Sequence, residues 1–124
     1  MYGGMKGLLH RHVQKNKTVN DGVAVAASTS TATSDPIIVR GYDSLVVYGS
    51  KTGSSTEVEI QILPVDVDEV TVGSNPISTF TLTATLLNDN VSLAKGRPAV
   101  AIKIVNDDSS NADVVTTKVV ATWT

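Results

Sequence analysis

Cysteine is absent from the 124-residue sequence, and aromatic residues make up only 4% of it. Without cysteine the chain has no thiol nucleophile, no thiolate metal ligand and no disulfide. The scarcity of aromatic side chains leaves little material for the stacking platforms that bind sugars or single-stranded nucleic acid. Long apolar runs are also missing, so we expect no membrane-spanning helix. The N-terminal residues lack the apolar core of a signal peptide, and we expect a soluble, unprocessed chain.

Charge is distributed unevenly along the chain. Residues 1–20 contain four basic residues and no acidic residue, which gives this segment a charge of +4 and leaves −6 for residues 21–124. The pattern predicts a basic N-terminal arm, residues 1–20, extending from an acidic domain, residues 21–124. The acidic domain argues against nucleic acid as a partner.

The predicted arm combines apolar and basic side chains that would suit a contact with another protein. We predict that this interface is made by Leu8, Leu9, Arg11, Val13, Lys15 and Lys17. The leucines and the valine would bury apolar surface on a neighbour, while the basic residues would meet acidic groups. The alternative is a flexible tail, because chain termini stay unordered unless a contact holds them.

The remaining sequence predicts β-strands joined by turns. Val58, Ile60 and Ile62 alternate with polar residues, which is typical of a strand with one buried face. We expect strands at 23–33, 37–40, 45–48, 56–62, 70–72, 80–86, 100–104 and 114–123, and turns at 49–55, 73–76, 88–90, 95–98 and 106–111. Phe80 and Trp123 stand in register with apolar neighbours and are expected in the core. Such regular strands and turns predict one all-β domain, an antiparallel β-sandwich of about eight strands.

Groups that could carry out catalysis or bind metal are few. His10 and His12 are the only histidines and both lie in the arm, so neither a catalytic triad nor a complete metal site is expected from them. The acidic residues at 66–69 and 107–113 could ligate calcium or form a glycosidase pair, but solvated loop carboxylates are the simpler interpretation. Glycine motifs that bind phosphate are absent. We therefore expect no enzyme activity, no metal and no cofactor.

Several segments carry a resemblance to a known family: Arg40-Gly-Tyr-Asp-Ser-Leu-Val-Val-Tyr48, Val58-Glu-Ile-Gln-Ile62, Pro98-Ala-Val-Ala-Ile-Lys-Ile-Val-Asn106 and Val114-Val-Thr-Thr-Lys-Val-Val120. Over residues 36–122 the sequence resembles small jelly-roll-like virion proteins of tailed bacteriophages. The resemblance implies a jelly-roll-like sandwich with an extended arm and a structural role in the virion. It supplies no catalytic residues.

The role implied by this resemblance is that of a head decoration (cement) protein on the capsid surface, or of a tail or neck component. Tail variants carry a longer hairpin with a tryptophan, and residues 65–73 contain none, which favours the capsid. The expected partners are the major capsid protein or another virion protein, and further copies of the chain, with a trimer favoured. The alternatives are a tail or secreted adhesion or carbohydrate-binding module, and a small hydrolase.

Overall fold

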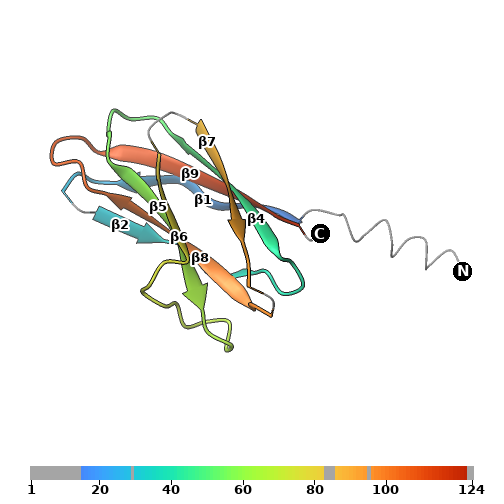
Figure 1. Ribbon diagram of the computed structural model, residues 1–124. Coiled ribbons are helices and arrows are strands. Elements are labelled where there is room, and N and C mark those ends of the chain that lie inside the picture. Colours follow the sequence, from blue (N-terminus) through green and yellow to red (C-terminus); the bar gives the residue numbers. More distant parts are fainter. Residues whose placement is uncertain (1–14, 29, 83–85, 95, 123–124) are drawn as a thin grey trace, which may run out of the picture.

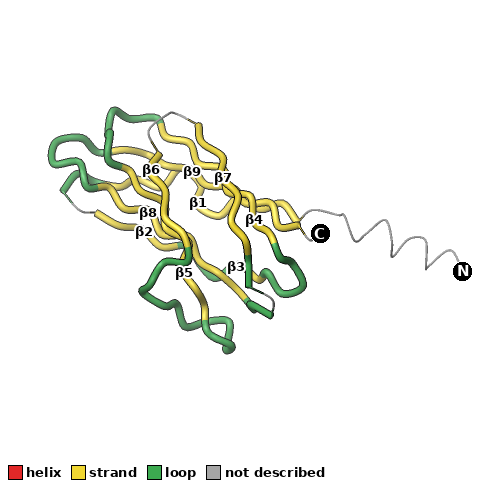
Figure 2. The backbone as a smooth tube through the Cα atoms, viewed as in Figure 1, coloured by secondary structure: helices red, strands yellow, loops and turns green. Residues whose placement is uncertain are grey.

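The computed structural model describes residues 15–28, 30–82, 86–94 and 96–122, and every regular element within them is a β-strand (Figure 1, Figure 2). The strands are β1 (Lys15–Val25), β2 (Ser30–Thr33), β3 (Ile37–Ile38), β4 (Ser44–Lys51), β5 (Val58–Val65), β6 (Ser78–Leu82), β7 (Leu86–Ser92), β8 (Ala99–Asn106) and β9 (Asp113–Thr122). The predicted all-β class is confirmed.

The strands form two antiparallel sheets that face each other. The first sheet has the order β1-β9-β4-β7, and the second has the order β2-β8-β5-β6 with β3 also paired to β8. Most connections pass from one sheet to the other, so strands far apart in the sequence become neighbours, such as β1 and β9. This order is that of a jelly roll, in which two four-stranded sheets enclose the core. The predicted antiparallel sandwich is therefore confirmed.

The core lies between the two sheets, where the alternating residues of each strand point inward. Val58, Ile60 and Ile62 are fully buried, as predicted, and Phe80 packs against them from β6. Trp123, the other aromatic residue expected in the core, lies outside the described residues. Burial of this apolar face is the main force that holds the sheets together.

The first strand begins earlier than predicted. β1 starts at Lys15 and pairs with β9 along its length, with Lys15 opposite Ala121. The Thr117 hydroxyl donates a buried hydrogen bond of 2.6 Å to Asn20 Oδ1, which joins the two strands inside the sandwich. Residues 15–20 therefore belong to the sheet, although we had assigned them to the arm. Their polar composition hid the strand, because β1 lies at the edge of its sheet and much of it faces solvent.

Other predicted boundaries also differ in the structure. The strand expected at 80–86 includes parts of two strands in different sheets, because β6 ends at Leu82 and β7 begins at Leu86. The strand expected at 23–33 is divided into β1 and β2 by a turn in which Ser28 has a φ of 68°. The turn expected at 88–90 lies within β7, an edge strand paired to β4. Polar residues are tolerated there because the outer face of an edge strand is open to water. The Ser44 hydroxyl, for example, donates a hydrogen bond of 2.8 Å to Asn90 Oδ1 across the pair.

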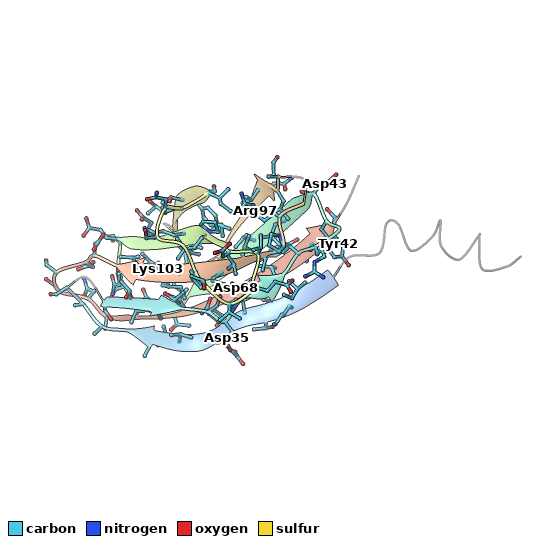
Figure 3. The ribbon with its side chains drawn as sticks, turned by 90° about the horizontal axis from the view of Figure 1, so that it is seen from below. Asp35, Tyr42, Asp43, Asp68, Arg97 and Lys103 are labelled. Carbon is cyan, nitrogen blue, oxygen red and sulfur yellow. The ribbon has the colours of Figure 1, made fainter. Side chains whose placement is uncertain are left out.

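A long loop between β5 and β6 folds over the outer face of the second sheet. In place of the strand expected at 70–72, Val72 makes a single bridge to Val65. Val65 and Val72 pack with Ala99 and Ala101 of β8 in a second, smaller apolar cluster. Figure 3, which views the molecule from below, shows the loop with Asp68 in front of this sheet. The loop therefore covers the outer face of β8 at Ala99 and Ala101, which are both fully buried.

Candidate interaction surfaces

The predicted arm interface falls largely outside the described residues. Leu8, Leu9, Arg11 and Val13 lie there, as do His10 and His12. Lys15 and Lys17 belong to β1, and the Lys17 side chain is exposed. The described end of the predicted interface is therefore a sheet-edge strand that lies beside β9.

Asp68 organises the tip of the β5–β6 loop. Its Oδ1 accepts hydrogen bonds of 2.9 Å from the N–H groups of Val70 and Thr71, and its Oδ2 accepts one of 2.6 Å from the Thr71 hydroxyl. The hydroxyl bond of Thr71, followed by the backbone bonds, lowers the pKa of Asp68 below its ordinary value. Glu69, at a φ of 63°, forms an ion pair with Arg40. These carboxylates hold the loop in shape.

This ordered loop presents two apolar side chains to solvent. Val67 is 84% exposed and Val70 is 71% exposed, the highest values among large apolar residues in the described chain. A main-chain hydrogen bond of 2.9 Å from Asp66 to Thr71 closes the loop beneath them. We call residues 66–72 the valine tip. The sequence predicted a strand at 70–72 and solvated loop carboxylates at 66–69, and it did not predict this exposed pair of valines.

Asp108, from the acidic residues at 107–113, holds the loops at the end of the sandwich opposite the valine tip. Asp108 accepts hydrogen bonds from the N–H groups of Ser110, Thr56 and Asn111. The bonds from Ser110 and Thr56, with the side chain of Asn111, lower the pKa of Asp108 to about 2. Asp108 is buried, so it is a structural group of the loops and not the solvated carboxylate that we expected.

Asn106 connects three loops at that same end. Its side chain is fully buried, and its Nδ2 lies 3.3, 3.2 and 2.9 Å from the carbonyl oxygens of Val25, Ala26 and Asn111. Its Oδ1 accepts a bond of 2.7 Å from the Ser55 hydroxyl. The β1–β2, β4–β5 and β8–β9 loops thus converge on one amide. No local pattern indicates this role, because Asn106 lies at the edge of the turn predicted at 106–111.

A buried ion pair joins the end of β4 to the start of β9. Lys51 Nζ is 3.5 Å from Asp113 Oδ2, and the two side chains are 8% and 0% exposed. Lys51 also donates to the Gly53 carbonyl at 3.0 Å, and Gly53 N donates to Asp113 Oδ1 at 2.7 Å. A Cβ on Gly53 would stand 2.8 Å from the Ala112 carbonyl oxygen, so glycine is required for this close approach.

An apolar hollow of about 480 Å³ opens next to the ion pair. Its apolar side chains are Ala24, Val25, Ala26, Ala112 and Val114. The alanines are exposed and Val114 is 38% exposed, so apolar surface is accessible there. The residues that line the hollow lie in or beside the β1–β2, β4–β5 and β8–β9 loops. These loops are at the end of the sandwich away from the β5–β6 loop, as the strand register requires and as Figure 1 shows.

Aromatic side chains do not assemble into a platform within the described residues. Tyr42 is half-buried and packs against the core, as does Phe80, while Tyr48 is 36% exposed on the outer face of β4. Figure 3 shows Tyr42 at the end of the molecule where β4 begins. No group of three or more potential metal ligands occurs among the residues the structure describes. The same residues contain no helix long and apolar enough to span a membrane.

Known proteins share this fold at low sequence identity. No family model matches the sequence, and no curated protein matches it. The crystal structure of the SPBc2 prophage-derived protein YomS is similar over 89% of this chain and 94% of its own, with a TM-score of 0.53 and 20% identity. The infectious bursal disease virus VP2 subviral particle matches over 91% of this chain, with a TM-score of 0.57 and 13% identity. The match covers 33% of the VP2 chain.

A carbohydrate-binding protein has the same fold. The module CBM6cm-2 from Cellvibrio mixtus lichenase 5A, solved with cellotriose, matches over 89% of this chain and 91% of its own, with a TM-score of 0.52 and 12% identity. At these identities the similarity establishes the jelly-roll sandwich and leaves function to the surfaces.

Proposed function

We propose that the chain is a non-enzymatic structural protein of the virion, of the capsid decoration (cement) type. The jelly-roll order of its strands carries the proposal, because a prophage-derived protein and a viral subviral-particle protein have the same fold. The acidic residues that the sequence offered for catalysis or calcium binding are engaged within the fold, because Asp68 and Asp108 hold loops and Asp113 is buried with Lys51.

The basic N-terminal segment provides the proposed attachment to the particle. In this proposal Leu8, Leu9 and Val13 bury apolar surface on the partner, and Arg11 and the lysines meet its acidic groups. The partner is the major capsid protein or another virion protein, and further copies of the chain form a trimer on the capsid surface. Because β1 is already paired from Lys15 onward, the segment would start from a fixed point on the sheet edge.

A carbohydrate-binding or adhesion module is the second candidate. The similarity to the cellotriose-bound module favours it, since the two chains match over most of their lengths. Sugar recognition generally uses exposed aromatic faces, and Tyr42 is half-buried against the core. Titration with soluble oligosaccharides would test this candidate, and we expect no saturable binding.

Particle binding by truncated protein tests the first proposal. Deleting residues 2–14 leaves β1 complete, so the variant should still fold. Its melting temperature should equal that of the full chain. We expect it to lose co-sedimentation with particles that lack the native protein. Arg11→Glu should weaken binding, with a larger effect at low salt, whereas Lys118→Glu on the exposed face of β9 serves as the control. Undiminished binding of the truncated protein would refute attachment through this segment.

A further inference from the structure

The valine tip and the apolar hollow lie at opposite ends of one rigid sandwich. β5 runs from Val58, opposite Asn106, to Val65, opposite Ala99, so its far end leads into the tip. Asn106 and the loops that line the hollow are at the other end of the same strand pair. A contact between tip and hollow therefore requires two molecules.

The tip is built to present its valines without further ordering. Three interactions fix the backbone of the tip in the free molecule. They are the main-chain hydrogen bond from Asp66 to Thr71, the hydrogen bonds that Asp68 accepts, and the Arg40–Glu69 ion pair. Binding through such a loop avoids most of the entropy cost of ordering it. Two neighbouring valines at 84% and 71% exposure are also unlike the isolated apolar residues that are common on protein surfaces.

The hollow is apolar, like the two valine side chains of the tip, and it is large enough to hold both. Its volume of about 480 Å³ exceeds that of two valine side chains, and its exposed wall combines three alanines and Val114 with the uncharged residues Thr52 and Gly53. Asp113, the charged residue that lines the hollow in the described part of the chain, is buried and paired with Lys51. The acidic side chains that flank the tip would therefore meet no exposed carboxylate among the residues that line the hollow.

We propose that the valine tip of one copy inserts into the apolar hollow of the next, so that copies associate head to tail. A contact of this kind uses different surfaces on the two molecules and continues into a ring or a chain. Two valines bury far less than the roughly 1,200–2,000 Å² of a stable interface. The contact is therefore weak between free molecules and gains strength where an assembly repeats it.

Complementation between two variants tests this geometry with the full-length protein. The tip variant, Val67→Ser/Val70→Ser, removes the two exposed apolar side chains, and the hollow variant, Ala24→Arg, fills the hollow with a long charged side chain. All three positions are exposed, so neither variant should change the melting temperature. In sedimentation velocity at high protein concentration, the native chain should show association that each variant loses by at least tenfold. A mixture of the variants should regain one contact and stop at a 1:1 dimer. Thr79→Ser and Ala94→Arg, exposed and outside both surfaces, are the controls.

Cysteine cross-linking provides an independent measurement, because the native sequence contains no cysteine. A Val67→Cys protein mixed with an Ala24→Cys protein should form a disulfide-linked heterodimer, whereas Val67→Cys mixed with Ala94→Cys should not.

A monomeric native protein, or a tip variant that associates normally, would overturn the proposal. Loss of association in the hollow variant alone would also overturn it, and would place a different segment in the hollow. The inference does not depend on the virion role, since association is measured without particles, and its failure would leave the particle-binding experiment unaffected.

Discussion

Replacing Asn106 by alanine should strongly destabilise the protein, because its buried side chain joins three loops at one end of the sandwich. The amide donates to carbonyls of the β1–β2 and β8–β9 loops and accepts from Ser55 Oγ at 2.7 Å and Asp108 N at 3.2 Å. Each net hydrogen bond contributes about 0.5–1.5 kcal/mol, and buried groups left unpaired add to the loss. We therefore expect a decrease of about 3–5 kcal/mol in the free energy of unfolding.

Urea denaturation followed by circular dichroism measures this loss. The total stability of a small domain is about 5–15 kcal/mol, so the midpoint of Asn106→Ala should move far toward zero urea. Asn106→Asp keeps the shape and the acceptor but cannot donate to the carbonyls, and should not restore stability. Ser109→Ala, an exposed change in the neighbouring loop, is the control and should cost under about 0.5 kcal/mol. A loss below about 1 kcal/mol for Asn106→Ala would refute the role assigned to this amide.

Other predictions concern the core, the ion pair and acid stability. Ile60→Ala should cost about 2–5 kcal/mol in urea denaturation and Glu59→Ala under about 0.5, and equal costs would contradict the assigned faces of β5. Lys51→Met should cost about 3–5 kcal/mol because it strands the buried Asp113 carboxylate, and Lys51→Met/Asp113→Leu should recover part of that loss. Since Asp108 titrates at about 2 in the folded chain against an ordinary value of 3.8, its stabilising effect is present above pH 3.8 and is lost as the pH falls toward 2. Asp108→Asn should flatten the dependence of the melting temperature on pH in that window, and an unchanged slope would contradict it.

Alternation in the sequence predicted the fold where a strand has one buried face and one polar face. Val58, Ile60 and Ile62 follow that rule, and their burial is complete. The rule failed at β1, because an edge strand with polar residues on both faces leaves no hydrophobic period to detect. The strand expected at 70–72 was also wrong, because hydrogen bonds to Asp68 fold this stretch into a loop in which only Val72 makes a bridge to Val65.

The hollow and the buried ion pair could not be predicted from the sequence for a related reason. The hollow is assembled from three loops that are far apart in the sequence and brought together by Asn106, and no local pattern reports such convergence. Similarly, nothing in the sequence pairs Lys51 with Asp113, because their strands become neighbours only when β4 and β9 align. The basic character of residues 1–20 was visible from composition alone, whereas the structure was needed to locate the start of β1.

The proposed virion role requires that a virus encode this chain, and cryo-electron microscopy of particles of that virus would test the proposal most directly. If the chain is a decoration protein, density that fits the jelly roll should repeat over the capsid surface, with the segment before Lys15 in contact with a neighbouring protein. Deleting the gene should remove that density from otherwise assembled capsids. Particles that contain no such density, and no peptides of this chain in their mass spectra, would contradict the virion role.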